Sequence, residues 1–124
     1  MKLTFRVALL AFAGGALGTF FRWWLGYAIN DSLWAIATVN LLGAYAIGFF
    51  NGHSWFNTDA RRALYSVGFC GGFTTLSALM ANVTSPMTAV FVTLEFVAGI
   101  AVYLAGRNSG HASSIRGDEE ANRA

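Results

Sequence analysis

The sequence predicts an all-α membrane protein with four transmembrane helices. Its 124 residues are 56% hydrophobic and 11% charged, whereas a soluble domain of this size needs more charge to cover its surface. Hydropathy divides the chain into four apolar runs, each close to the ~20 residues that span a bilayer. None of the runs alternates with a period of two, which disfavours a transmembrane barrel. Because backbone groups in lipid must pair internally, helices are the simplest interpretation.

The apolar runs set the expected order of elements: 5–29, 33–50, 63–83 and 87–105. The first run is too long for a signal peptide and three further spans follow it, so we expect it to be retained. The connections between the runs are short, which makes sequential helices antiparallel neighbours, and Pro86 suits the first turn of the fourth helix. We therefore expect a membrane domain over residues 1–106 and a polar, disordered tail over 107–124 with no assigned function.

Seven of the eight Lys and Arg residues fall on one side of the predicted bundle. They lie at the start of the first run, in the middle loop and after the fourth run, and the other two loops contain none. The positive-inside rule then predicts that both termini lie in the cytoplasm of a bacterial inner membrane.

Several functional classes are disfavoured by composition. One cysteine and two isolated histidines offer neither a disulfide framework nor a Cys or His metal site. The net charge of +2 rests on scattered residues rather than a basic stripe, so no nucleic-acid partner is expected. Because no nucleophile and base pair is present, we do not expect an enzyme.

The centre of the third run is unusual for a transmembrane helix. It reads Cys70-Gly71-Gly72-Phe73-Thr74-Thr75-Leu76-Ser77. Glycine weakens a helix interior, and Thr and Ser compete for its backbone bonds, so we predict a local break. Irregular backbone in the middle of a membrane persists only when it is buried in protein or lines a polar cavity, which points to an ion or substrate site. The alternative is a continuous helix whose hydroxyls bond to their own backbone.

Three other polar residues lie within apolar runs: Arg22, Asn40 and Glu95. Ionisable groups in a membrane are costly and usually face a bundle interior or water, so Glu95 is a candidate functional residue. It could instead remain protonated or pair with Arg22. Asn40 suits an anion pathway because it donates and accepts hydrogen bonds, although a bond between helices is the simpler interpretation.

Taken in order, these motifs resemble the small bacterial fluoride channels called Fluc or CrcB. The matching residues are Gly14-Gly15-x-x-Gly18-x-x-x-Arg22, Val39-Asn40-x-x-Gly43 with Gly48, and Gly68-Phe69-Cys70-Gly71-Gly72-Phe73-Thr74-Thr75-x-Ser77. The resemblance implies an antiparallel, dual-topology-type dimer of four-helix subunits with a broken third helix and two pores at the interface. It also implies passive fluoride efflux that protects the cell from fluoride toxicity.

The family resemblance also implies roles for single residues. Asn40 corresponds to the pore-lining asparagine, and Arg22 to a structural arginine near the end of the first helix. The carbonyls of Gly71 and Thr74 would help to hold a structural sodium ion at the dimer centre. Asn, Thr and Ser are suitable donors to fluoride, which adds Thr75 and Ser77 to the anion path.

At four positions of the anion path the chain departs from the family pattern. Leu76 and Leu79 replace the two phenylalanines of the usual T-T-F-S-T-F segment, and leucine lacks the positive ring edge of an aromatic side chain. Phe91 stands where a pore tyrosine is usual and Glu95 where a serine is usual. An ionised Glu95 would repel fluoride.

The charge count explains these departures. An antiparallel homodimer needs subunits inserted in both directions, whereas seven Lys and Arg residues on one side favour a single orientation. We therefore expect an oppositely oriented homologous subunit, with a heterodimer favoured over a homodimer. Two alternatives are a proton-coupled exporter of the small multidrug-resistance type, which would need a carboxyl in the first helix, and a non-conducting scaffold subunit.

Overall fold

The computed structural model describes residues 2–29 and 33–124. Within them lie eight helical elements: α1 (Phe5–Ile29), α2 (Leu33–Gly52), η1 (Ser54–Phe56), α3 (Asp59–Arg61), η2 (Arg62–Cys70), α4 (Gly71–Phe73), α5 (Leu76–Ala81) and α6 (Pro86–Arg123). They form four segments long and apolar enough to span a membrane, as predicted. We call Asp59–Ala81, which contains α3, η2, α4 and α5, the third span. The predicted loop over residues 30–32 lies outside the described residues.

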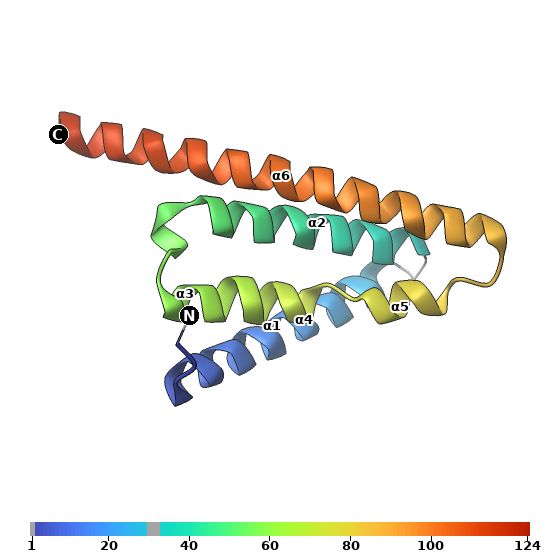
Figure 1. Ribbon diagram of the computed structural model, residues 1–124. Coiled ribbons are helices and arrows are strands. Elements are labelled where there is room, and N and C mark those ends of the chain that lie inside the picture. The colour runs from blue at the N-terminus through green and yellow to red at the C-terminus, as the bar shows by residue number, and fades with distance from the viewer. Residues whose placement is uncertain (1, 30–32) are drawn as a thin grey trace.

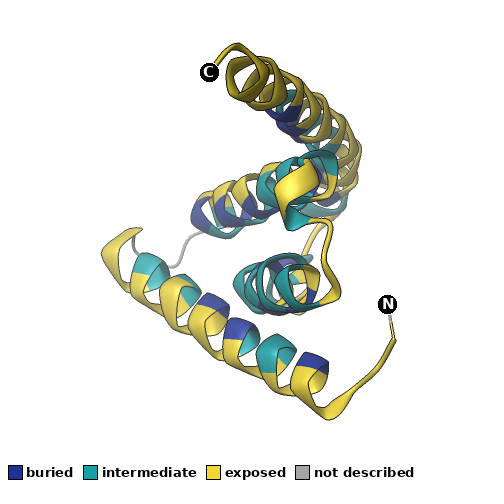
Figure 2. Ribbon diagram, turned by 90° about the vertical axis from the view of Figure 1, so that its left-hand side faces the viewer, coloured by how far each residue is buried: buried dark blue, intermediate teal, exposed yellow. Residues whose placement is uncertain are grey.

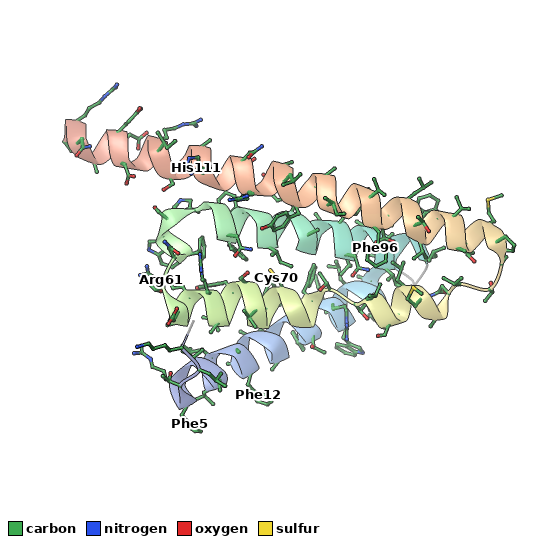
Figure 3. The ribbon with its side chains drawn as sticks, in the orientation of Figure 1. Phe5, Phe12, Arg61, Cys70, Phe96 and His111 are labelled. Atoms are coloured by element: carbon green, nitrogen blue, oxygen red, sulfur yellow. The ribbon has the colours of Figure 1, made fainter. Side chains whose placement is uncertain are left out.

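The spans form two pairs. Helix α6 runs along α2, and the part of the third span before the break, η2 and α4, packs against α1, whereas α5 contacts α2 (Figure 1). The start of α1, the end of α6 and the α2–α3 turn lie at the same end of the bundle, and the α5–α6 connection lies at the other (Figure 1). Arg61 marks the first end in Figure 3. The charged segments identified in the sequence therefore share one end of the molecule.

Both pairs of spans depend on glycines at close backbone contacts. A side chain at Gly48 or Gly106 would collide with the backbone of the facing helix, at Tyr103 and Tyr45 respectively. Between α1 and the third span, the same holds for Gly14, Gly18 and Gly72. In lipid, such close approach supplies the van der Waals packing that drives association.

Little of the surface is buried within one subunit. Large apolar side chains face outward along every span, and Phe12 on α1 is 76% exposed. Figure 2 shows the buried residues of α1 restricted to the face toward the rest of the bundle, and Figure 3 shows Phe5 and Phe12 pointing away from it. This distribution suits a protein whose outer surface meets lipid or another membrane subunit.

The predicted disorder of residues 107–124 is wrong. Helix α6 begins at Pro86, where Ser85 and Thr88 form a capping box, and continues without interruption to Arg123. Beyond the apolar run, Gly110 packs against the backbone of Phe49, and Ser114 is hydrogen-bonded to Ser54. These contacts with the end of α2 and with η1 hold the first part of the polar segment in a helix.

Candidate functional site

The third span is broken near its middle, as the sequence predicts. Helix α4 ends at Phe73, α5 starts at Leu76, and the two residues between them are extended, with φ/ψ of −80°/151° at Thr74 and −147°/107° at Thr75. The break falls just after the glycine pair, because Gly71 and Gly72 are themselves helical. The glycines alone therefore do not interrupt the helix.

Asn40 on α2 holds the broken segment. Its amide oxygen accepts a hydrogen bond from the backbone N–H of Thr75 at 2.7 Å, and its amide nitrogen donates to the Thr75 carbonyl at 3.1 Å. One side chain thus satisfies both backbone groups of an extended residue, as a neighbouring β-strand would. Such satisfaction is what irregular backbone in a membrane requires.

Hydroxyl groups cap the two helix ends at the break. The Thr74 hydroxyl donates to the carbonyl of Cys70 at 2.9 Å, and the Thr75 hydroxyl accepts from the N–H of Ala78 at 3.3 Å. The Thr75 and Ser77 hydroxyls also lie 3.3 Å apart. A glycine at position 43 makes room for the methyl group of Thr74.

These bonds redirect two donors that would otherwise complete a helix. In a continuous helix, the carbonyl of Gly71 would accept from Thr75 N–H, and that of Thr74 from Ala78 N–H. Here the Thr75 N–H donates to Asn40, and the Ala78 N–H donates to the Thr75 hydroxyl. The two carbonyls proposed from the sequence as cation ligands have therefore lost their regular helical donors.

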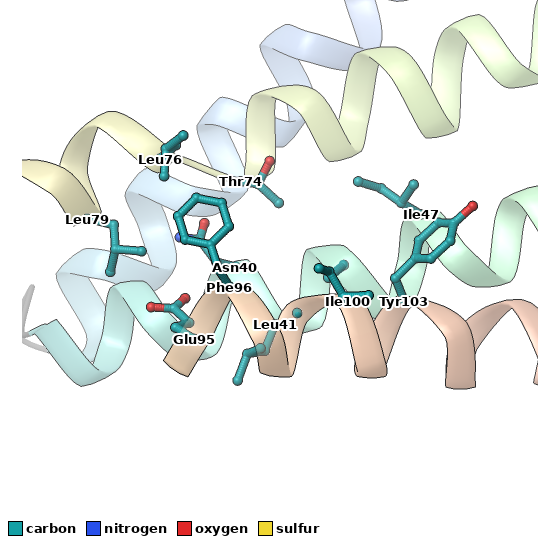
Figure 4. Close-up of a pocket in the computed structure, with 12 residues that line it drawn as sticks. Asn40, Leu41, Ile47, Thr74, Leu76, Leu79, Glu95, Phe96, Ile100 and Tyr103 are labelled. Carbon is teal, nitrogen blue, oxygen red and sulfur yellow. The ribbon is translucent and has the colours of Figure 1, made fainter. Parts of the chain in front are cut away.

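An apolar cavity of about 330 Å³ lies between α2, α6 and the broken part of the third span. Figure 4 shows Glu95 and Leu79 facing each other across it, with Asn40 and Thr74 at its edge. The remaining lining is Leu41, Ala44, Ile47, Leu76, Phe96, Gly99, Ile100 and Tyr103. We call this space the Glu95 cavity.

A larger and more polar cavity, of about 960 Å³, is lined by α1, α2 and the third span. Arg22, Thr75, Ser77 and Asn82 contribute its polar groups. We call it the Arg22 cavity. It combines a permanent positive charge with hydroxyl and amide donors, which are the groups that attract an anion and replace its water.

The structure thus distributes the predicted residues between two cavities. Asn40, Leu76, Leu79 and Glu95 line the first, and Arg22, Thr75 and Ser77 line the second. Phe91 lines neither; its ring packs edge-on against Trp34 with 4.8 Å between the ring centroids.

The sequence analysis missed Asn82, which lines the Arg22 cavity and donates to the carbonyl of Ala78 at 2.7 Å. An amide near the end of an apolar run was the available signal. It also missed Thr19, whose hydroxyl lies 3.4 Å from the Gly72 carbonyl just before the break. The corresponding signal was its position in the sequence directly after Gly18, the residue that packs against the third span.

Comparison with known proteins gives consistent matches. The family described as CrcB-like protein, Camphor Resistance (CrcB), matches residues 9–107, which include the apolar part of all four spans. A protein of Klebsiella pneumoniae named fluoride-specific ion channel FluC is 42% identical over 88 residues, which cover 64% of this chain and 68% of that protein.

Two further relatives extend the comparison. A protein of Corynebacterium glutamicum named fluoride-specific ion channel FluC 1 is 42% identical over 89 residues, covering 70% of this chain and 83% of the relative. A protein of Xanthomonas axonopodis named fluoride-specific ion channel FluC is 36% identical over 121 residues, which cover 82% of this chain and 88% of that relative. No solved structure gives a significant match.

Proposed function

Because this chain belongs to the CrcB-like family, we infer that it is a subunit of a fluoride-specific ion channel and not an enzyme. The observation that carries this conclusion is the family match across all four spans, which includes the break held by Asn40. Passive efflux through such a channel removes fluoride that entered as neutral HF and dissociated inside, and so protects a bacterium from fluoride toxicity. No energy coupling is required for that role.

The anion path follows the two cavities on either side of the broken segment. In the Arg22 cavity, the guanidinium attracts the anion, and the hydroxyls of Thr75 and Ser77 donate to it. On the other side, Asn40, Leu76, Leu79 and Glu95 line the path. Fluoride is a strong hydrogen-bond acceptor, so a series of neutral donors replaces its water without holding it too tightly.

A structural sodium ion fits the carbonyls of Gly71 and Thr74. Sodium is a hard cation that takes oxygen ligands, and the regular helical donors of both carbonyls are bonded elsewhere. Gly71 is exposed and no neighbour lies within 4 Å of its side-chain position, so its surface is open to a second subunit. A cation there would lower the cost of bringing an anion into the membrane.

The partner is an oppositely oriented homologous subunit, and a heterodimer fits this chain better than a homodimer. The charged segments share one end of the molecule (Figure 1), which favours one orientation with that end in the cytoplasm. Gly71 and Gly99 have open space around them, whereas most of the chain's glycines are in close contact within the subunit. Small residues on an open face suit close approach by another membrane helix.

Cysteine labelling tests the orientation. Cys70 is the single cysteine and is buried, so a cysteine introduced by Asn57→Cys or Thr84→Cys becomes the reactive group at one end or the other. In spheroplasts, a membrane-impermeant maleimide should label Thr84→Cys and leave Asn57→Cys unlabelled until the membrane is permeabilised. The unaltered chain is the control. Equal labelling of both variants from outside would show two orientations and overturn the heterodimer proposal.

Efflux from proteoliposomes, followed with a fluoride electrode, tests conduction. The chain alone should give little efflux, and the chain together with a second four-helix subunit of opposite charge distribution should give rapid efflux. Rapid efflux from the chain alone would show that it forms a working homodimer. Equal efflux from the partner with and without this chain would show that the chain only accompanies a channel.

A further inference from the structure

Glu95 is a buried carboxyl group with no positively charged residue beside it in the part of the chain that the structure describes. Its side chain is 8% exposed, and among the residues described neither carboxyl oxygen has a hydrogen-bond partner. Asn40 is the polar side chain of the lining that interacts with Glu95, but its amide oxygen and one of its N–H groups are already bonded to the backbone of Thr75. A carboxylate in such surroundings is costly, so the group must either bind a cation or be protonated.

The groups that face Glu95 provide no permanent cation. From α2 come Asn40, Leu41, Ala44 and Ile47; from the third span Thr74, Leu76 and Leu79; and from α6 Phe96, Gly99, Ile100 and Tyr103. The phenol of Tyr103 is the one other titratable group in this lining, and it is two helical turns away along α6. The carboxyl of Glu95, the amide of Asn40, the hydroxyl of Thr74 and the distant phenol of Tyr103 provide too few side-chain oxygens for a metal ion. A proton is the cation that this cavity can accommodate.

We propose that Glu95 is a proton-operated gate on the fluoride path, an inference that depends on the channel function proposed above. As a neutral acid, the group presents an O–H that can donate to fluoride, and the anion passes. As a carboxylate, it places a negative charge in an apolar cavity of about 330 Å³ and excludes the anion. The proton comes from the aqueous phase and stays on the carboxyl while fluoride passes, so no covalent step is involved.

The position of Glu95 favours a gate over a purely structural role. It faces Leu79 across the cavity (Figure 4), in a region where the lining offers few other polar groups to an anion. The acid O–H therefore replaces donors that leucine does not supply. Since fluoride accepts hydrogen bonds more strongly than larger halides, one such donor also favours fluoride. The gate would open under acid conditions, where entry of HF is fastest.

The pH dependence of fluoride efflux tests the proposal. Proteoliposomes containing this chain with its partner subunit are measured between about pH 5.5 and about pH 8.5, with equal pH on both sides. Efflux by the unaltered channel should fall about tenfold per pH unit on the alkaline side, as expected for one titrating proton. Glu95→Gln should keep, throughout the range, the efflux rate that the unaltered channel has at acid pH. Glu95→Asp retains a carboxyl group and should again show efflux that falls as the pH is raised.

The matched control is Glu119→Gln, which alters an exposed carboxyl on the same helix and should leave the pH profile unchanged. Identical profiles for the unaltered channel and Glu95→Gln would overturn the gate and leave the channel function intact. Absence of efflux from every variant at every pH would instead contradict the channel function.

A second readout does not depend on conduction. Infrared difference spectra of the unaltered protein against Glu95→Gln, both in lipid, should show the C=O band of a protonated carboxyl that disappears as the pH is raised and shifts when fluoride is added. Carboxylate bands alone at every pH would overturn the proposal, because Glu95 would then be permanently ionised and paired with a charge from the partner.

Discussion

Helix α6 and the third span contain the same helix-weakening residues, yet only the third span is broken. Helix α6 has glycines and hydroxyl residues along its length and remains continuous for 38 residues. In both helices a threonine hydroxyl donates to the carbonyl four residues earlier, Thr93 to Ala89 and Thr74 to Cys70, each at 2.9 Å. Neither glycine content nor this local bond therefore explains the break.

The difference lies in what the neighbouring helix offers. Facing the break, Asn40 supplies a donor and an acceptor to the backbone of Thr75. Facing α6, helix α2 presents glycines and backbone in close contact, which favours a smooth helix. A membrane helix can therefore break where a side chain of another helix replaces its lost backbone hydrogen bonds. Substitutions at the residues involved test that explanation.

Asn40→Ala should have the largest effect. It leaves the N–H and carbonyl of Thr75 without their partners, and each unsatisfied group costs about 1–3 kcal/mol. We expect the free energy of unfolding to fall by about 2–4 kcal/mol and efflux to fall at least about tenfold, since the path loses its shape. Unfolding in mixed micelles followed by circular dichroism, together with the efflux assay, measures both.

The matched control for that variant is Asn51→Ala, also on α2, which removes one exposed hydrogen bond from Ser66. It should change the free energy of unfolding by less than about 0.5 kcal/mol. If the two alanine variants unfold alike, the break is a property of the third span itself and the role assigned to Asn40 is wrong.

Gly18→Ala should have the next largest effect, about 1–3 kcal/mol of destabilisation. A methyl group there meets the backbone of Phe69, which cannot move aside as a side chain could. Gly117→Ala is the matched control, because its added methyl group meets nothing within 4 Å in the exposed part of α6 and alanine favours a helix by about 1 kcal/mol. Thermal unfolding of both variants compares them, and equal losses would show that backbone contact is not what holds α1 to the third span.

Thr75→Val tests the cap of α5, with an expected loss of about 1 kcal/mol because the bond to the N–H of Ala78 disappears. Ser85→Ala removes the corresponding cap of α6 and should cost a similar amount. The two variants should differ in function, since only Thr75 lines the Arg22 cavity. Efflux reduced equally by both would indicate that stability, not the hydroxyl in the path, limits conduction.

Removal of residues 117–124 should have the smallest effect, within about 0.5 kcal/mol, because that part of α6 is exposed and Gly117 has no neighbour within 4 Å. A deletion that begins at residue 108 also removes Gly110 and Ser114 from their contacts with α2 and η1. It should destabilise the α2–α6 pair measurably in the same thermal assay. Equal melting temperatures for the two deletions would show that those contacts contribute nothing.

Much of the fold could be predicted because lipid restricts the choices. The bounds of α1 agree with its apolar run, and Pro86 marks the start of α6. The helical tail could not be predicted in the same way, because its polar composition is typical of disorder. What holds it is the four-residue spacing of Gly106, Gly110 and Ser114, which contact α2 and η1, and hydropathy does not report such contacts.

The break in the third span could be predicted from its composition, but the arrangement of the groups around it could not. Local sequence drew attention to Gly71 and Gly72, whereas the break lies at the two residues that follow Phe73. Its position depends on Asn40, which is 35 residues away in the chain. The separation of the polar residues into two cavities likewise depends on how the helices pack, as does the placement of Phe91 against Trp34.

The length of α6 has a mechanical consequence. At about 1.5 Å per residue, 38 residues extend about 57 Å, and the hydrocarbon layer is about 30 Å thick. A large part of the helix therefore projects into water as a stiff rod, and its packing against α2 fixes its direction. A fluorophore or small fusion domain joined to that helix would rotate together with the membrane domain. It would therefore serve as a rigid marker in electron-microscopy images of this small protein. A small tilt between subunits would also produce a larger displacement at the far end of the helix.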